Sequence, residues 1–180
     1  MNRKGRKIVT VCFLIIVFVA AALPALITCV LHDGESARAI LAWQSHARFN
    51  GAGGVLLQKK DNGCGPAALA MIFSAHNVAS SVDSLERELA LTQHGAIMSN
   101  LKRVAENHML RVSAWRLTAS HLRHIPLPAV LFLRQGHFVV LDSVITGNRA
   151  YLRDPAIGRI TISTTHLGRL WDGETLLFEK

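Results

Sequence analysis

Cys64 is the residue with the clearest capacity for chemistry, because it lies between a glycine-containing loop and the predicted start of a helix. Pro66 suits the first position of that helix, because a backbone N–H at this position has no partner within the helix and proline has none to leave unpaired. The run from Ala67 to Ile72 supplies strong helix formers and predicts a helix that continues to about Asn77. Unpaired N–H groups at a helix start favour negative charge, which lowers the pKa of a thiol. The pattern favours a nucleophilic Cys64, and a small, inert, buried cysteine is the alternative.

A cysteine nucleophile needs a base that accepts its proton and a third group that orients the base. His137 begins an apolar stretch, and Asp154 ends a predicted strand seventeen residues later. If the turn at 147–148 pairs residues 138–146 with residues 149–154, His137 and Asp154 lie on neighbouring strands at one edge of a sheet. A histidine satisfied within the core and an Asp-Pro turn are the structural alternatives.

Gln58 precedes Cys64 by six residues, close enough for its side-chain amide to point an N–H at an oxyanion forming beside the thiolate. Together with the backbone N–H of Cys64, it would form an oxyanion hole. A glutamine before a helix is otherwise an ordinary surface residue. Asp142 is a second acid near His137, but five residues along one strand should place it on the opposite face.

The order and the flanking residues of this set resemble a known family. The motifs are Gln-x5-Cys-Gly-Pro-Ala, then Gly-His-Phe-Val-Val-Leu, then Asp-Pro, and they are similar to those of the C39 peptidases over about residues 55–178. These are papain-like domains that process double-glycine leader peptides. The resemblance implies an α+β papain-like fold, with the cysteine-bearing helix packed on an antiparallel sheet. It further implies these roles: nucleophile for Cys64, general base and acid for His137, orienting partner for Asp154, and oxyanion-hole residue for Gln58.

Hydrophobic spacing and turn residues independently predict helices first and antiparallel strands later, which is the order of an α+β domain. Asp83 followed by Glu86 has the pattern of a capping box, and Ser99 is the predicted cap of another helix. Val55–Leu57 is predicted as a short strand or an extended approach to the loop. Helices are predicted at 37–48, 66–77, 83–91, 99–108, 121–125 and 164–171, and strands at 110–116, 128–134, 138–146, 150–154, 159–163 and 175–178.

Residues 8–31 form a run of 24 residues without a charge, long enough to span a bilayer. Four basic residues precede the run, whereas acidic residues follow it, so the positive-inside bias leaves the N-terminus in the cytoplasm. A single-pass anchor fits the length. A cleaved signal with a poor site near 20–25 and a lipoprotein signal acylated at Cys29 are the alternatives. The predicted organisation is a basic flank at 1–7, a membrane segment at 8–31, a connector at 32–54 and a peptidase domain at 55–180.

The composition excludes several other classes. The net charge of +8 falls to +4 without the four basic residues before the membrane segment, and the remaining cations are scattered, which argues against nucleic-acid binding. His121 and His124 have a spacing that can bind metal, but no carboxylate or cysteine cluster is near, so no metal and no cofactor is expected. Cys12 and Cys29 belong to the membrane segment and leave Cys64 as the domain's only thiol, without a disulfide partner.

Together these features predict a cysteine endopeptidase in the inner membrane, whose domain cleaves a peptide or protein in the periplasm or outside the cell. Processing or secretion of an exported protein is the expected setting, with secretion-system components as partners. The rival interpretation is a non-hydrolytic adaptor that binds a secretion substrate through the same fold. A third is amide or acyl transfer on a similar scaffold.

Overall fold

The computed structural model describes residues 20, 22–24, 27–28, 34–145 and 148–179. Residues 1–37 and 38–180 form two separate compact units. Within the described part of the chain, no helix is both long and apolar enough to cross a membrane. The basic flank and most of the segment at 8–31, including Cys29, lie outside the described residues. The anchor and its alternatives therefore stay predictions.

One antiparallel sheet of seven strands forms the frame of the second unit, in the order β1-β6-β5-β4-β3-β7-β2. The central strands β3, β4, β5 and β6 are neighbours in sequence and pair as successive hairpins, so short connections determine their register. Strand β7 then crosses back to lie between β3 and β2. The strands are β1 (Arg48–Phe49), β2 (Arg111–Arg116), β3 (Ala129–Leu133), β4 (His137–Ile145), β5 (Arg149–Asp154), β6 (Gly158–Ser163) and β7 (Trp171–Glu179).

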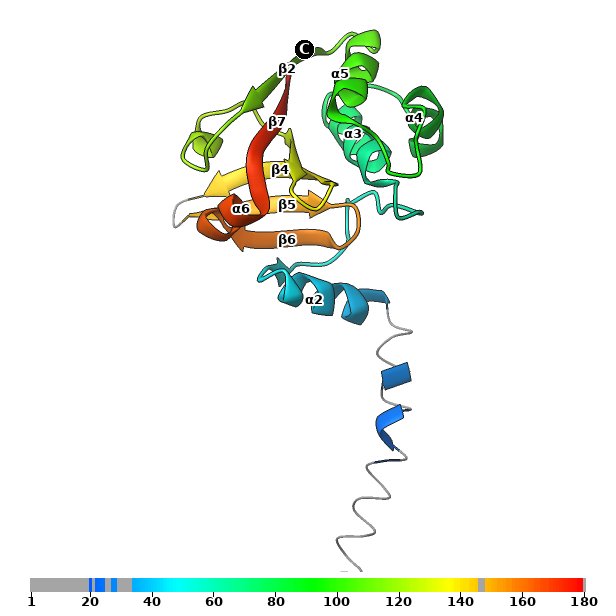
Figure 1. Cartoon of the computed structure of the whole chain (residues 1–180), viewed down its shortest axis with the longest axis vertical. Coiled ribbons are helices and arrows are strands. Elements are labelled where there is room, and N and C mark those ends of the chain that lie inside the picture. Colours follow the sequence, from blue (N-terminus) through cyan, green and yellow to red (C-terminus); the bar gives the residue numbers. More distant parts are fainter. Residues whose placement is uncertain (1–19, 21, 25–26, 29–33, 146–147, 180) are drawn as a thin grey trace, which may run out of the picture. The chain divides into compact units, whose positions relative to one another are not determined.

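Helices cover both faces of this sheet. Helices α3, α4 and α5 group together on one side, as Figure 1 shows, and α6 lies near the strands that flank it in sequence. This arrangement confirms the predicted α+β fold with an antiparallel sheet. The helices are α2 (Gly34–Gln44), α3 (Cys64–Ala75), α4 (Val82–Glu88), α5 (Met98–Asn107), the 3₁₀ turn η1 (His121–Arg123) and α6 (Thr164–Leu170).

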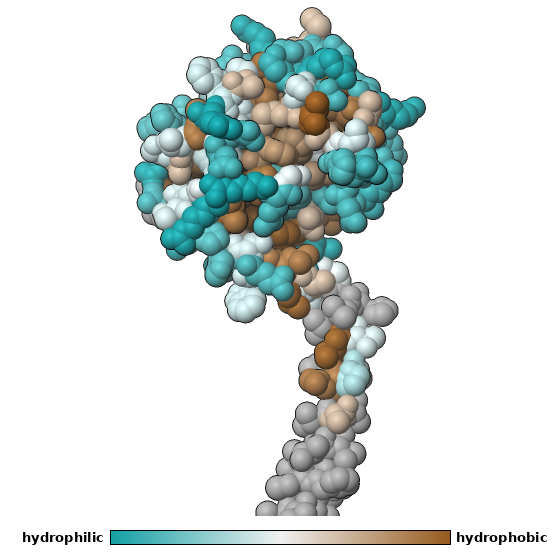
Figure 2. All heavy atoms as spheres, viewed as in Figure 1, coloured by the Kyte–Doolittle hydropathy of each residue, from teal (hydrophilic) through white to brown (hydrophobic). Residues whose placement is uncertain are grey.

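Two cores follow from the alternation of side chains along the strands. Phe138 and Val140 on β4 face α3, where they join a buried cluster with the helix residues 68–73. Val139 and Leu141, on the other side of the same strand, join a second cluster with Ala42 of α2 and with α6. Strand β4 is therefore buried on both faces, which explains the unbroken apolar run after His137. Figure 2 shows a band of apolar residues down the middle of one face of this domain, between hydrophilic flanks.

Several predicted helix boundaries are wrong in detail. Helix α3 begins at Cys64, so Pro66 is its third residue and not its first. Proline is still tolerated there, because the N–H groups of the first turn have no partner within the helix. Helix α5 begins at Met98 after the N-cap Ile97, which makes no side-chain cap, so Ser99 lies inside the helix.

The start of α4 also differs from the prediction. Its capping box is formed by Ser81 and Ser84: each side chain accepts a hydrogen bond from the backbone N–H of the other residue. Asp83 and Glu86 are instead free to form ion pairs with lysines. Residues 55–57 are not part of a strand and approach the loop as irregular backbone, which the extended alternative allowed.

Candidate active site

Cys64 is the first residue of α3, directly after the N-cap Gly63. Its side chain is buried, with 5% of the residue exposed. The next residue is a glycine for a steric reason, since a Cβ on Gly65 would lie 2.9 Å from the Cβ of Ala96. The helix start can therefore approach the segment before α5 closely. Cys64 lies where the sequence predicted, with the unpaired N–H groups of the first turn around it.

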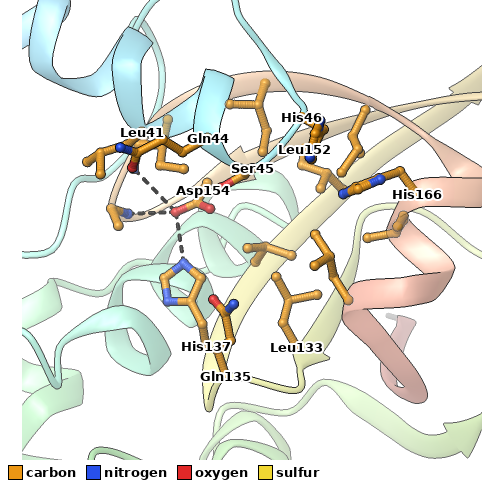
Figure 3. Close-up of a pocket in the computed structure, with 17 residues that line it drawn as sticks. Leu41, Gln44, Ser45, His46, Leu133, Gln135, His137, Leu152, Asp154 and His166 are labelled. Carbon is orange, nitrogen blue, oxygen red and sulfur yellow. Dashed lines mark hydrogen bonds and ion pairs between the residues drawn. The ribbon is translucent and has the colours of Figure 1, made fainter.

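His137 and Asp154 are joined by a hydrogen bond of 2.8 Å between Nε2 and Oδ1. The pairing of β4 with β5 brings them together: Val140 lies opposite Arg153, so both side chains lie at the same edge of the sheet. Asp154 Oδ1 also accepts hydrogen bonds from the backbone N–H groups of Ala156, at 2.8 Å, and Ile157, at 3.2 Å. Figure 3 shows these three bonds converging on the carboxylate. The acid is thus held by the turn that follows its strand.

Cys64 and His137 interact with each other. Because Nε2 of His137 faces Asp154, Nδ1 is the ring nitrogen left for the thiol. Burial alone raises the pKa of the Cys64 thiol, but a hydrogen bond from His137, the backbone N–H of Phe138 and the charge of His137 together lower that pKa below its ordinary value. The thiolate is therefore favoured by its neighbours.

The pKa of His137 is shifted in the opposite direction to that of Cys64. Burial alone lowers the pKa of His137, but the hydrogen bonds to Asp154 and Cys64 and their charges outweigh it and raise the pKa to about 10. A raised pKa for the imidazole and a lowered pKa for the thiol favour the same state, a thiolate next to an imidazolium. This ion pair is the activated form of a cysteine nucleophile.

Gln58 lies close to both halves of the site. Its backbone N–H donates to the carbonyl of Pro155, the residue after Asp154, at 2.8 Å. Its Cβ is 3.4 Å from the point that a Cβ on Gly63 would occupy, so it packs against the residue before Cys64. Its Nε2 donates one long bond of 3.4 Å to the carbonyl of Asp61, and its Oε1 is buried without a partner. A side-chain amide has two N–H donors, so one remains for an oxyanion.

Asp142, the other acid near His137, has a different partner. Both of its carboxylate oxygens accept a hydrogen bond from the Nε of Arg153 at 2.9 Å. It makes no hydrogen bond to His137 among the bonds of the described residues, whereas Asp154 does. These hydrogen bonds agree with the prediction that Asp154, and not Asp142, is the partner of His137.

Sequence reasoning missed the contacts that hold the loop between Gln58 and Cys64. Lys60 forms an ion pair of 2.9 Å with Glu86 of α4, and Lys59 forms one of 3.2 Å with Asp83. The hydrogen bond to Glu86 raises the pKa of Lys60. Asn62 donates to the carbonyl of Thr92 at 2.9 Å. These partners lie about 24 to 30 residues away in sequence, and no local pattern in the loop indicates them.

The described residues contain no group of three or more histidine, cysteine, aspartate or glutamate side chains that could hold a metal ion. Nδ1 of His121 lies 2.8 Å from the hydroxyl of Thr118, which accounts for one nitrogen of the spaced pair with His124. Within the same part of the chain, Cys64 is a free cysteine. The chemistry that this site offers is therefore that of a thiol, an imidazole, a carboxylate and an amide.

Comparison with known proteins points to one family. Residues 54–180 match the profile described as the Peptidase C39 family. The probable functional amyloid protease FapD of Pseudomonas aeruginosa is 30% identical, over 64% of this chain and 56% of FapD. The colicin V secretion/processing ATP-binding protein CvaB of Escherichia coli is 34% identical, over 68% of this chain and 17% of CvaB. The chain thus spans about half of one relative and about a sixth of the other.

Solved structures agree with this assignment. A double glycine motif protease from an AMS/PCAT transporter, in complex with a leader peptide, superposes with a TM-score of 0.65 at 26% identity, covering 69% of this chain and 89% of the other. The N-terminal peptidase C39 like domain of a toxin secretion ATP-binding protein from Vibrio parahaemolyticus gives 0.57 at 24% identity, covering 67% and 98%. The second of these supports the fold alone.

Proposed function

The chain belongs to the Peptidase C39 family of cysteine peptidases, and we propose that it cleaves a peptide or protein substrate during the processing or secretion of an exported protein. The observation that carries the proposal is the hydrogen bond of 2.8 Å between His137 and Asp154, at a site where His137 also interacts with the thiol at the start of α3. An inert buried cysteine does not need an oriented histidine beside it.

The first half of the proposed reaction forms an acyl-enzyme. The Cys64 thiolate attacks the carbonyl carbon of the scissile bond, and the carbonyl oxygen becomes an oxyanion. The backbone N–H of Cys64 and the free N–H of Gln58 donate to this oxyanion. The His137 imidazolium then gives its proton to the leaving amine, the C–N bond breaks, and the acyl group remains on the sulfur as a thioester.

The second half releases the acid. His137 is now neutral and accepts a proton from a water molecule, which attacks the thioester carbonyl. The oxyanion forms again at the same donors, and the C–S bond breaks to give a carboxylic acid and the thiolate, with the proton on His137. Asp154 holds the imidazole ring in one orientation through its Oδ1 in both halves of the reaction.

The location of the domain is a further part of the proposal. The uncharged segment at 8–31 and the basic residues before it support a single-pass anchor with the domain outside the cytoplasm. A topology reporter fused after residue 180 tests it: alkaline phosphatase, which is active only when exported, is expected to be active. Activity of a cytoplasmic reporter at the same junction would contradict this location.

The proposed activity is tested by incubating the purified full chain with a library of proteome-derived peptides and identifying new ends by mass spectrometry. We expect cleavages that are absent with the Cys64→Ala variant. Binding of peptides without any cleavage would instead favour the adaptor, and products that carry an added amine would favour acyl transfer. The in vivo substrate class follows from comparing the envelope proteins of cells that carry the wild-type chain or the Cys64→Ala variant.

A further inference from the structure

Part of the structure around the site comes from outside the family match, which begins at residue 54. Residues 38–49, the larger part of α2 and strand β1, belong to the same compact unit as the peptidase fold. Ala42 is fully buried in the second core, and β1 pairs with β6 through Arg48 opposite Thr161 and Phe49 opposite Ile160. We call residues 38–49 the N-terminal extension. It is anchored to the sheet and is not a free connector.

The extension forms one wall of a cavity of about 470 Å³. Leu41, Gln44, Ser45 and His46 line this wall, and strands β3 to β6, the β3–β4 and β5–β6 turns and helix α6 supply the rest. In Figure 3, Gln44 and Ser45 lie toward Asp154, whereas His46 and His166 lie at the other end. Leu41, Gln44 and His46 are exposed residues, so the cavity is open to solvent along the extension.

The catalytic residues that line the cavity indicate which side of the scissile bond it serves. His137 and Asp154 line it, whereas Cys64 and Gln58 do not. The acyl part of a substrate is bonded to the Cys64 sulfur and has its oxygen next to Gln58. The leaving amine takes its proton from His137. A cavity beside the His137–Asp154 pair therefore lies on the leaving-group side.

The lining also indicates the chemistry of the occupant. Behind the catalytic pair, the floor consists of aliphatic side chains, among them Leu152, Ile160 and Ile162, each at most 4% exposed. Neither lysine nor arginine lines the cavity, and Asp154, its carboxylate, is already bonded to His137 and two backbone N–H groups. Polar side chains also line the cavity, but none of them is buried: Gln44, Ser45, His46, Gln135 and His166. A charged side chain that reached the aliphatic floor would lose hydration without gaining a partner there, whereas an apolar one would be stabilised by burial.

We propose that this cavity is a specificity pocket for an apolar side chain of the substrate residue that directly follows the scissile bond, and that the N-terminal extension sets its size. The inference rests on the proposed peptidase function. The continuity of the cavity with the His137–Asp154 pair identifies the peptide substrate as its occupant. The extension thereby gives this chain a selectivity that the matched region, 54–180, does not contain by itself.

The test changes Leu41, which lines the cavity and is 45% exposed, so its replacement leaves the buried core intact. Leu41→Trp narrows the pocket and Leu41→Ala widens it. Ile40→Ala is the matched control, because Ile40 is the neighbouring residue on α2, is 42% exposed and does not line the cavity. Each full-length variant is incubated with the same proteome-derived peptide library, and the residue after each cleaved bond is recorded.

The wild-type chain and the Ile40→Ala control are expected to favour leucine, isoleucine, methionine or phenylalanine after the cleaved bond. In Leu41→Trp, kcat/KM for peptides with these residues falls at least about tenfold relative to peptides with alanine there, the scale on which apolar pockets discriminate. Leu41→Ala shifts the preference toward larger residues. Cleavage by the wild-type chain with an unchanged preference in both Leu41 variants overturns the pocket and leaves the peptidase function standing. Absence of any Cys64-dependent cleavage overturns the function and the pocket together.

Discussion

The two halves of the site are held by different kinds of structure. Cys64 and Gln58 belong to a helix start and the loop before it, within seven residues of sequence, and Cys64 packs in the core formed by α3, α4 and α5. His137 and Asp154 belong to two paired strands and depend on the β4–β5 register. In the proposed mechanism, the first half provides the thiol and the oxyanion donors through local geometry. The second half provides the group that accepts and donates the proton and the acid that orients it, on two paired strands of the sheet.

Both halves of the site control the reactivity of the thiol. Burial in the helical half works against the thiolate, and the favourable contributions to its pKa come from His137 and Phe138 on β4, with a smaller one from the backbone of Gly65. A change in either half should therefore affect the nucleophile, but by different routes. Substitutions in the first half should remove a reacting or stabilising group. Substitutions in the second half should change the protonation of the Cys64 thiol.

Removal of the nucleophile should have the largest effect. In Cys64→Ala we expect a loss of kcat/KM on the order of 10⁵-fold, because no other group can form the thioester. The thermal midpoint should change little, since alanine fits the small buried site. Residual Cys64-independent cleavage at more than a few per cent of the wild-type rate would show that the reaction does not go through this residue.

The oxyanion donor ranks next. Gln58→Ala should reduce kcat by about 10² to 10³-fold with a smaller change in KM, since the lost N–H acts on charge that develops in the transition state. Gln58→Glu keeps the shape of the side chain without the donor and should be at least as slow. Single-turnover kinetics on one cleaved peptide separates the two parameters. Equal activity of Gln58→Glu and the wild type would exclude the side-chain amide as the donor.

The orienting acid has a matched control on the same hairpin. Asp154→Asn should lower kcat/KM by about 10 to 100-fold, because the neutral amide no longer stabilises the imidazolium. Asp142→Asn should change it less than about twofold, since Asp142 is bound to Arg153 and not to His137. Comparable losses in the two variants would indicate a general weakening of the hairpin and no special role for Asp154.

The pH dependence follows from the two shifted pKa values. Activity should rise with pH as the thiolate forms, below the ordinary pKa of a thiol, because the pKa of Cys64 is lowered. It should fall again as His137 loses its proton, near the raised pKa of about 10. In Asp154→Asn the alkaline limb should move to lower pH, since Asp154 is the leading contribution that raises the pKa of His137. A profile of kcat/KM with the same alkaline limb in both proteins would contradict this coupling.

Loss of the Lys60–Glu86 ion pair, which holds the loop between Gln58 and Cys64, should have the smallest effect. Lys60→Gln removes an ion pair with Glu86 whose lysine is largely exposed, and such pairs contribute little. We expect kcat/KM to fall less than about threefold, with the same small loss in Glu86→Gln and no further loss in the double variant. A much larger loss in Lys60→Gln alone would mean that the lysine acts on the substrate directly.

The sequence predicted those features of both halves that depend on residues close to each other along the chain. The Gly63–Pro66 pattern predicts the helix start at Cys64 within two residues, because a proline and the following alanines act over one or two turns. The apolar strand after His137 and the turn before residue 150 predicted the hairpin that joins His137 to Asp154. Both depend on contacts between neighbours in sequence.

Features that depend on distant contacts could not be predicted in the same way. Ser81 and Ser84 form the cap that was assigned to Asp83 and Glu86, because those acids pair with lysines more than twenty residues away. Residues 32–54 were predicted as a connector with a helix at 37–48, and nothing in that stretch shows that Ala42 is buried against the far side of the sheet. The cavity that the N-terminal extension builds could only be recognised once the layers were in place.

The shared control of the thiol is tested most directly by the pH dependence of alkylation at Cys64. The full chain with Cys12→Ser and Cys29→Ser carries a single thiol, and its rate of reaction with iodoacetamide reports the thiolate. We predict a titration below the pKa of a free cysteine, which moves to higher pH in His137→Ala because burial is then opposed only by the smaller contributions of the backbone N–H groups of Phe138 and Gly65. A titration at or above the free-cysteine value that is the same in both proteins would contradict the ion pair on which the account depends.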